Sequence, residues 1–462
     1  MEIIEEAISR AVRYRKFNSL ITETFELARA QAREALRLGK TPFPVVVKDC
    51  YMTKKVRTTC ASRNLSSYTA PYTATIVDRL FLKVWRLPGG CLIGKANMDE
   101  FCMGTSSSKG YFGPVKNGLS NEQCLESDWR SPGGSSGGCA VAVQLGISSI
   151  SLGSDTGGSS RNPAAFTGIF GFKPSYGILS RHGLIPLVNS LDTPSILART
   201  AEDCNTVLQV MSGRDPLDST CINAPLSCFM QHRPLDGIVE YYNDTLSHDC
   251  WDAWNEAAKV LVAQGCKLRE VSMPWTSYSI ICYHVLAEAD ITSNMARFDG
   301  VKYGHRSDCG KSTFAMYSAT RSESLNEVVR RRIFAGNYFL MKRHCDEYFG
   351  QALRLRRLIK TDFDRAFREL KCDVLLTPVT SDVAPLFSEL SDSSGYVRER
   401  ADDFYTQPSN MAGVPAVSVP FTRAAQRKDL PLAVQIIADY MNDGLVLDVA
   451  AKLREHCMLA TG

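Results

Sequence analysis

The sequence predicts an α/β protein in which helices cover both faces of one large β-sheet. Short β-branched runs alternate with helix-periodic segments along the chain, and this order is typical of a sheet packed between helical layers. The 462 residues can bury a large core, and 44% hydrophobic against 22% charged residues is the balance of a folded globular protein. No convincing linker interrupts the sequence, so we expect a single domain over residues 1–462.

The first predicted elements lie between residues 23 and 152. Glu23–Leu38 has apolar residues at helical spacing with charged residues between them, which predicts an amphipathic helix. Val45–Val47 is a β-branched run that predicts a buried strand ending at Lys48. Ala140–Leu145 predicts a helix and Ile147–Leu152 a strand. Because glycine-serine loops flank this pair of elements, we expect the two loops to come together.

The second half of the chain continues the alternation. Trp251–Gln264 predicts a helix that Gly265 can cap, and Leu268–Val271 predicts the beginning of a strand. Asn337–Leu370 is long, charged and helix-favouring. The remaining predicted elements are strands at Val374–Leu376, Ala416–Pro420 and Ala433–Ala438, and a last helix from about Leu445 to His456.

Composition excludes several classes of protein. A net charge of +4 is too weak to build a nucleic-acid-binding face by itself. The 16 cysteines contain no C-x-x-C pair, which favours buried free thiols in a reducing compartment over a disulfide framework. No apolar run approaches the ~20 residues of a membrane span. The N-terminal sequence has neither a signal-peptide core nor the acid-poor composition of a transit peptide.

Residues 131–177 contain the richest candidate for a functional site. Taken alone, GGSSGG resembles a flexible linker. It opens directly into a helical run, however, and a second loop, Asp155–Arg161, follows another apolar run. Loops packed between buried elements use glycine for unusual backbone angles and close approach, so we interpret this segment as part of a site.

Two other motifs are weakened by their context. Gly133–Gly137 matches the G-x-S-x-G nucleophile elbow, but polar residues precede it instead of a strand, and the best histidine, His182, has no obvious acidic partner. Gly89–Lys95 matches a phosphate-binding loop, but Ala96 lacks the hydroxyl that would bind Mg²⁺. Since no histidine or cysteine pattern has zinc spacing, we predict no metal site.

Three motifs together resemble those of the amidase signature enzymes. They are VVVKD around Lys48, GGSSGG around Ser135 and GSDTGGSSRNPAAF around Ser159. The resemblance implies an amidase signature fold with one large mixed sheet, and residues 131–177 as its core signature. It also implies that Lys48 is the base, that Ser135 relays the proton from a cis peptide bond, and that Ser159 is the nucleophile. The backbone N–H groups implied to face the oxyanion are those of Thr156, Gly157, Gly158 and Ser159.

Elementary chemistry is compatible with a lysine base. If Lys48 is buried among neutral groups, burial disfavours its charged form and lowers its pKa toward neutral pH. The alternative is a surface lysine at the end of a strand. Ser160 offers a second hydroxyl, but the match of GGS to the family favours Ser159. We assign Asp155 and Arg161 to the structure of the loop.

Further stretches resemble one subfamily, the A subunits of glutamyl-tRNA(Gln) amidotransferases, in their mitochondrial animal form. They are KANMDEFCMGTSS at 95–107, YFGPVKN at 111–117, SRHGLIPLVNSLD at 180–192, SNMARFDGVKYG at 293–304 and DDFYTQPSNMAGVPAVSVP at 402–420. The resemblance implies that Tyr283, Arg332 and Asp403 bind the charged groups of glutamine, with residues 213–330 contributing to the pocket. Arg330, Arg331 and Asp402 remain alternatives one or two residues away.

The same resemblance implies partners. Ammonia from glutamine would reach a B subunit that uses ATP and Mg²⁺ and holds most of Glu-tRNA(Gln), while a small C subunit joins the two. This chain would then need no cofactor, would not touch a membrane, and would work in the mitochondrial matrix, or otherwise in the cytoplasm. Two alternatives remain open: a stand-alone amidase for fatty-acyl or aryl amides, and a catalytically silent scaffold in the same assembly.

Overall fold

A nine-stranded sheet forms the centre of the described part of the chain. The computed structural model describes residues 1–81, 89–223, 246–310, 312–390, 398, 401–424, 427 and 430–455. The strand order is β1-β3-β2-β4-β6-β5-β8-β9-β7. The strands are β1 Leu20–Glu23, β2 Phe43–Lys48, β3 Gly90–Ala96, β4 Ile150–Asp155, β5 Phe170–Lys173, β6 Thr193–Ala198, β7 Val374–Pro378, β8 Ala416–Arg423 and β9 Pro431–Ala438.

The sheet is mixed, as the sequence predicts. β2 is parallel to β3 and to β4, whereas the other neighbouring pairs are antiparallel. Because β2 and β4 are parallel and adjacent, their carboxyl ends, at Lys48 and Asp155, reach the same edge of the sheet. Chemistry in α/β folds commonly lies at this edge.

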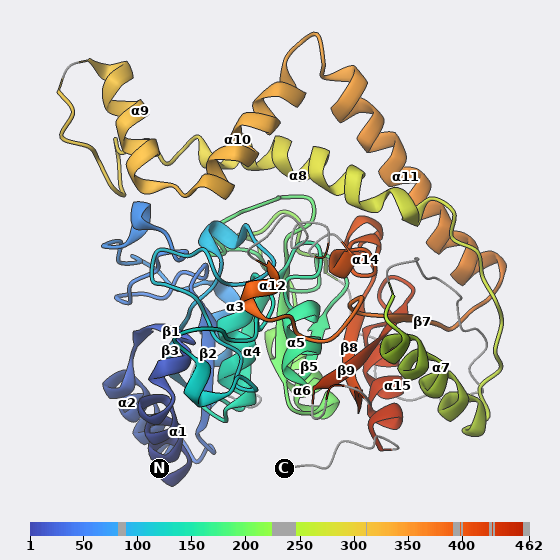
Figure 1. Cartoon of the computed structure of the whole chain (residues 1–462). Coiled ribbons are helices and arrows are strands. Elements are labelled where there is room, and N and C mark those ends of the chain that lie inside the picture. The colour runs from blue at the N-terminus through green and yellow to red at the C-terminus, as the bar shows by residue number, and fades with distance from the viewer. Residues whose placement is uncertain are drawn as a thin grey trace.

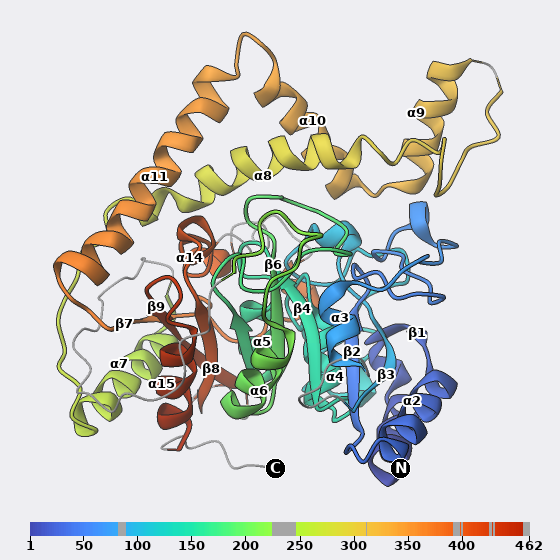
Figure 2. The same ribbon diagram turned by 180° about the vertical axis from the view of Figure 1, so that it is seen from behind.

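Helices cover both faces of the sheet (Figures 1 and 2). α1, α2, α4 and α5 pack on one face, and α3, α6 and α15 pack on the other. The helices are α1 Glu2–Arg13, α2 Phe25–Arg37, α3 Thr75–Leu80, α4 Gly137–Gln144, α5 Arg161–Thr167, α6 Ala201–Met211, α7 His248–Ala263, α8 Ser279–Met295, α9 Thr313–Ser324, α10 Glu327–Leu340, α11 Gln351–Asp364, α12 Phe387–Leu390, α14 Gln407–Ala412 and α15 Asp443–Glu455.

The run Val45–Val47 shows why the strand sequence is apolar at every position. Val45 and Val47 belong to the apolar cluster on the α6 and α15 face, and Val46 to the cluster on the α1, α2 and α4 face. Successive strand residues point to opposite faces, so a strand covered on both sides needs apolar residues throughout. The predicted fold class is confirmed.

One predicted element differs from the structure, and one helix-favouring stretch is divided. Asn337–Leu370 contains the end of α10, which stops at Leu340, and α11, which begins at Gln351. Both helices pack against α8, and the chain between them lies at the top of Figure 1. The strand predicted at Leu268–Val271 does not form, although the preceding Lys267 makes a single β-bridge.

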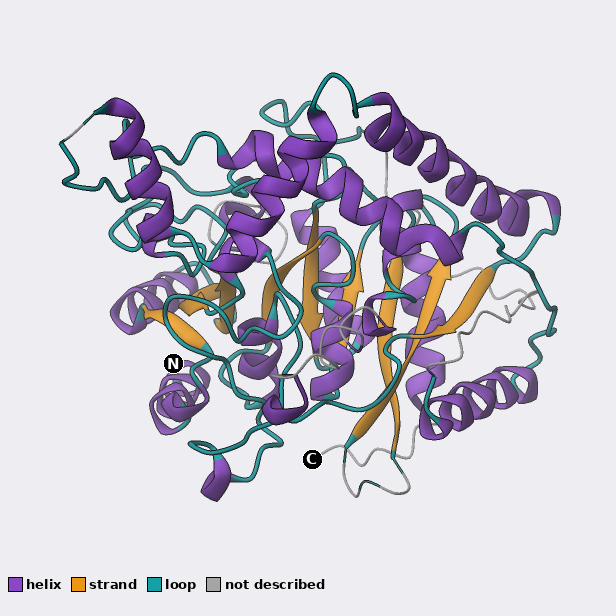
Figure 3. Ribbon diagram, turned by 45° about the horizontal axis from the view of Figure 1, so that its top comes forward, coloured by secondary structure: helices purple, strands orange, loops and turns teal. Residues whose placement is uncertain are grey.

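The other predicted elements are present with boundaries shifted by a few residues. His456, the predicted end of the last helix, lies outside the described residues. Figure 3 shows the strands side by side with helices around them, and α8, α10 and α11 passing over one edge of the sheet. This arrangement places helices that are remote in sequence above the ends of β2 and β4.

Candidate active site

The two glycine-serine loops lie side by side at the edge where β2 and β4 end. The first loop precedes α4, and the second connects β4 to α5. The Ser136 N–H donates to the Ser159 carbonyl at 3.0 Å, which joins the loops directly. The sequence order of loop, helix, strand and loop therefore brings the two loops together as expected.

Lys48 and Ser135 are in direct contact at the centre of this edge. The Lys48 Nζ donates to Ser135 Oγ at 2.7 Å and to Ser154 Oγ at 2.9 Å, and its side chain is fully buried. The peptide bond between Gly134 and Ser135 is cis. A surface position for Lys48 is thereby excluded.

The surroundings of Lys48 differ from the neutral pocket that the sequence reasoning assumed. Burial lowers the pKa of Lys48, but negative charge on Cys102, with smaller effects of Cys50 and Cys139, outweighs burial and raises the pKa above its ordinary value. Hydrogen bonding to Cys50 lowers the pKa of Cys102 to about 7, whereas burial raises the pKa of Cys139 to about 12 and that of Cys50 well above 9.0. Of these three thiols, Cys102 is the one close to ionisation near neutral pH, and its negative charge, with a smaller effect of Asp99, favours the charged form of Lys48.

Cys102 reaches Lys48 through a shared hydroxyl. Cys102 Sγ lies 3.6 Å from Ser154 Oγ, which also accepts the hydrogen bond of Lys48. The sequence offers no local signal for this contact, because Cys102 follows β3 while Lys48 ends β2. Only the parallel pairing of these strands brings the two residues together.

Ser159 and Ser160 differ sharply in their surroundings. Ser160 is fully buried, and its hydroxyl lies 2.5 Å from Ser195 Oγ and 3.3 Å from the Ser154 carbonyl. Ser159 is only partly buried. A nucleophile must be reached by its substrate, so this difference supports Ser159 over Ser160.

One of the N–H groups expected to face the oxyanion already donates a hydrogen bond within the protein. The Gly158 N–H donates to Asp155 Oδ1 at 2.9 Å, with Gly158 at a φ of +130° that favours glycine. Gly158 therefore does not belong to the expected set of donors, because the Asp155 carboxylate holds its N–H. The N–H groups of Thr156, Gly157 and Ser159 remain candidates.

Asp155 and Arg161 form a buried ion pair beneath the loop. Arg161 Nη2 and Nε donate to the two carboxylate oxygens of Asp155 at 2.8 and 3.0 Å, and both side chains are fully buried. Burial raises the pKa of Asp155, but the charge and hydrogen bonds of Arg161 outweigh it and hold that pKa well below its usual range. The guanidinium also donates to the Thr406 carbonyl and to the side chains of Ser409, Asn410 and Gln435. Loop structure was the predicted role, but the pair also ties the loop to the C-terminal segment.

Tyr283, Arg332 and Asp403 come together beside the serine loop. A Cβ on Gly157 would lie 2.9 Å from Tyr283 Cε2, so α8 touches the loop that carries Ser159. Burial raises the pKa of Tyr283 to about 12, the hydrogen-bonded Arg332 opposes this, and the charge of Asp403 adds to it. A cation and an anion thus flank one buried phenol.

The structure separates these residues from their sequence neighbours. Arg330 and Arg331 are exposed, whereas Arg332 is partly buried. Asp402 is turned to Ser381, whose hydroxyl donates to its Oδ1 at 2.6 Å. The helix face and the loop therefore favour Arg332 over Arg330 and Arg331, and Asp403 over Asp402, a choice that sequence spacing left open.

Gly336 explains how Arg332 reaches Tyr283. A Cβ at Gly336 would lie 1.9 Å from the Glu288 carbonyl of α8, so only glycine permits this close crossing of α8 and α10. Arg332 lies one helical turn before Gly336 on α10, and Tyr283 lies just before Glu288 on α8. The crossing brings the two side chains to the same place.

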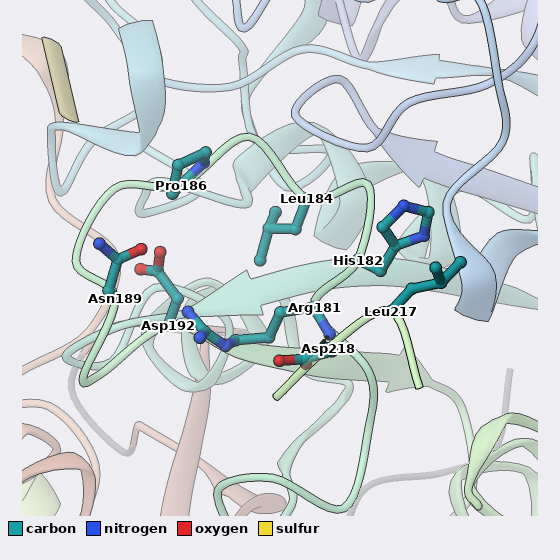
Figure 4. Close-up of a pocket in the computed structure, with 8 residues that line it drawn as sticks. All are labelled: Arg181, His182, Leu184, Pro186, Asn189, Asp192, Leu217 and Asp218. Carbon is teal, nitrogen blue, oxygen red and sulfur yellow. Dashed lines mark hydrogen bonds between the residues drawn. The ribbon is translucent and has the colours of Figure 1, made fainter. Parts of the chain in front are cut away.

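A polar pocket of about 190 Å³ lies next to the loop (Figure 4). Asp192, which lines it, accepts a hydrogen bond from Thr156 Oγ1 at 2.9 Å. His182 lines the same pocket and lies 3.2 Å from Thr75 Oγ1, with its ring stacked on Tyr72. A histidine held in this way does not complete a serine triad.

The other motifs have structural roles. Residues 90–96 form β3 instead of a phosphate-binding loop, and Lys95 pairs with the buried Asp49 at 3.1 Å. Within the described ranges, no group of three or more His, Cys, Asp or Glu side chains could hold a metal ion. The described helices include none that is long and apolar enough to cross a bilayer.

The chain is similar to known proteins along nearly its whole length. The Amidase family model matches residues 2–447. The A subunit of the mitochondrial glutamyl-tRNA(Gln) amidotransferase of Bos taurus is 44% identical, over 97% of this chain and 89% of that protein. The Homo sapiens protein of the same name is also 44% identical, over 97% and 89%. The solved structure of the glutamyl-tRNA(Gln) amidotransferase A subunit from Thermotoga maritima has a TM-score of 0.77 and 29% identity, covering 99% of this chain and 92% of that chain.

Proposed function

The chain belongs to the amidase family, and from this premise we propose that it hydrolyses glutamine as the A subunit of a glutamyl-tRNA(Gln) amidotransferase. The observation that carries the proposal is the cluster of Tyr283, Arg332 and Asp403 beside the serine loop. Glutamine carries an α-carboxylate and an α-ammonium. Arg332 suits the first, and Asp403 suits the second.

The proposed reaction needs the neutral form of Lys48, which is favoured when Cys102 is protonated and no longer raises the pKa of Lys48. Lys48 takes a proton from Ser135, and Ser135 takes one from Ser159, whose oxygen attacks the carboxamide carbon. The N–H groups of the loop stabilise the negative oxygen. When the carbon–nitrogen bond breaks, the proton on Lys48 returns through Ser135 to the leaving nitrogen, which departs as ammonia. Water then cleaves the glutamyl ester and restores Ser159.

The partners follow from the relatives' names and from the resemblance. We place ATP, Mg²⁺ and most of the contact with Glu-tRNA(Gln) on a B subunit, with a C subunit joining the two and no cofactor in this chain. A net charge of +4 over 462 residues agrees with a minor share of tRNA binding. The mitochondrial relatives support the mitochondrial matrix as its location.

Ammonia release from glutamine tests the proposal. The purified chain alone is expected to release ammonia slowly, and the chain with its B and C subunits faster, with conversion of Glu-tRNA(Gln) to Gln-tRNA(Gln). Hydrolysis of oleamide or benzamide without any partner, and no action on glutamine, would instead identify a stand-alone amidase. A complex that forms but releases no ammonia would identify a silent scaffold.

Two adjacent serines provide a matched pair of variants. Ser159→Ala is expected to abolish ammonia release, whereas Ser160→Ala, which removes a buried hydroxyl bonded to Ser195, should keep most of the activity. Circular dichroism checks that both variants fold. Activity lost in Ser160→Ala and kept in Ser159→Ala would reverse the assignment of the nucleophile.

A further inference from the structure

Gln407 has an arrangement that its position in α14 does not explain. Its side chain is 1% exposed, and its Nε2 donates to Asp403 Oδ2 across a long 3.4 Å. Its Cγ would lie 3.3 Å from a Cβ on Gly157. Gln407 therefore lies between the carboxylate of Asp403 and the loop that carries Ser159.

Among the described residues, none donates a hydrogen bond to the side-chain carbonyl oxygen of Gln407. This atom, Oε1, is buried. An unsatisfied buried acceptor is unfavourable and is rare in folded proteins. A buried amide oxygen that accepts no hydrogen bond and lies near a carboxylate is suited to bind a ligand that has several N–H groups.

A second amide holds the same carboxylate from the other side. Asn162 Nδ2 donates to Asp403 Oδ1 at 2.8 Å and lies 3.4 Å from the Asp402 carbonyl. This shorter bond fastens Asp403 to α5. Asn162 thus positions the carboxylate, while the weakly held Gln407 is free to change its contact.

The longer hydrogen bond of Gln407 leaves its amide able to turn over. The last torsion of a glutamine side chain is broad and roughly two-fold, so rotation of the amide exchanges Nε2 and Oε1 at little cost. An ammonium has three donors and no acceptor. Once an ammonium lies against Asp403, the amide oxygen is favoured at the place that Nε2 now occupies.

We propose that Gln407 is a further substrate-binding residue, whose Oε1 accepts a hydrogen bond from the α-ammonium of glutamine held at Asp403. The inference rests on the proposed function and extends it to a residue that sets selectivity for α-amino substrates. Asp403 supplies the charge, and Gln407 supplies a second, neutral acceptor.

The test compares two substrates that differ only at the α-amino group. Glutamine has this group, and glutaramate, the monoamide of glutaric acid, has the same carboxylate and carboxamide without it. Gln407→Met keeps the length of the side chain and removes its acceptor. In the complex with its partner subunits, we expect this variant to raise the KM for glutamine about tenfold, with kcat and the KM for glutaramate within about twofold of the wild type.

Two further variants make the outcome decisive. Asp403→Asn serves as the reference, since it should also raise the KM for glutamine while sparing glutaramate. Gln407→Glu keeps an acceptor and should leave the KM for glutamine nearer the wild type than Gln407→Met does. An equal rise in KM for both substrates, or no change for glutamine, would overturn the inference. A wild type that does not act on glutamine would instead contradict the proposed function.

Discussion

Replacing Arg161 by methionine tests whether the buried ion pair holds the serine loop to the rest of the site. Methionine fills part of the same volume and donates no hydrogen bond. Asp155 would then stay buried without its cation. The acceptors that lose their donor are the Thr406 carbonyl and the side chains of Ser409, Asn410 and Gln435.

The expected magnitude follows from these contacts. Removing one partner of a buried ion pair costs about 3–5 kcal/mol, because the other charge remains without compensation. Each buried acceptor that loses its donor adds about 1–3 kcal/mol before the site relaxes. Because the site relaxes, the separate costs do not add in full, and we expect Arg161→Met to lower the free energy of unfolding by at least about 5 kcal/mol. This is a large share of the ~5–15 kcal/mol that stabilises a typical protein.

The loss should depend on pH in a defined direction. In the wild type the pKa of Asp155 is depressed, so its contribution to stability is present above the unfolded pKa and disappears as the pH falls through the folded pKa. In Arg161→Met, burial acts without Arg161 and the folded pKa of Asp155 rises. As the pH falls, Asp155 becomes protonated at a higher pH in the variant than in the wild type, which removes the unpaired buried charge. The loss of stability caused by Arg161→Met is therefore largest near pH 8 and becomes smaller toward pH 4.

Urea unfolding followed by tryptophan fluorescence at pH 8 and pH 5 measures this difference. Arg37→Met is a matched control, because Arg37 pairs with Glu34 on an exposed helix face and its loss should leave the midpoint unchanged. Asp155→Asn combined with Arg161→Met should recover part of the loss by removing the unpaired charge. An Arg161→Met midpoint equal to that of the control would refute this account of the ion pair.

Three further predictions concern Cys102, Glu100 and Arg332. Cys102→Ala removes the negative charge that raises the pKa of Lys48. The acidic limb of the pH profile of kcat/KM for ammonia release should therefore move to lower pH. An acidic limb at the same pH as in the wild type would mean that Cys102 does not control the pKa of Lys48. Burial raises the pKa of Glu100 from 4.5 to about 7, so its charged form destabilises the fold as the pH rises through that range. Glutamine keeps only one of the two acceptors that Ser62 and Asn326 use, but the stability of Glu100→Gln relative to the wild type should rise by about 2–3 kcal/mol from pH 5 to pH 8. Equal urea midpoint shifts at both pH values would contradict it. Arg332→Ala should raise the KM for glutamine by about 10- to 100-fold, since a charge-assisted contact contributes about 1.5–3 kcal/mol, while the exposed Arg331→Ala should not change it; the reverse result would assign the contact to Arg331.

The fold class and the chemical candidates can be predicted from the sequence because both depend on local patterns. An apolar residue at every position of Val45–Val47 is required wherever a strand is covered on both faces. The motifs around Lys48, Ser135 and Ser159 carry their residue types in a fixed order, and the structure brings Lys48 and Ser135 into contact. The failure of the elbow and phosphate-loop readings also followed from local context alone.

The local structures that the sequence did not predict depend on contacts between parts of the chain that are far apart in sequence. The N–H of Gly158 was expected to face an oxyanion, but Asp155 holds it once Arg161 has fixed the carboxylate. The helix-favouring stretch Asn337–Leu370 is divided between α10 and α11, which both pack on α8. In each case a residue or helix distant in the chain decided the local structure.

The sequence by itself determined the alternation of elements, the mixed sheet through its family motifs, and the residue types of the candidate site. Only the tertiary structure decided that Cys102 neighbours Lys48, that Arg332 instead of Arg331 faces Tyr283, and that Gln407 lies against Asp403. The physical reason is that local patterns specify which face of an element is buried. The pairing of parallel strands and the close helix crossing at Gly336 decide which side chains then meet, and these contacts join residues far apart in the chain.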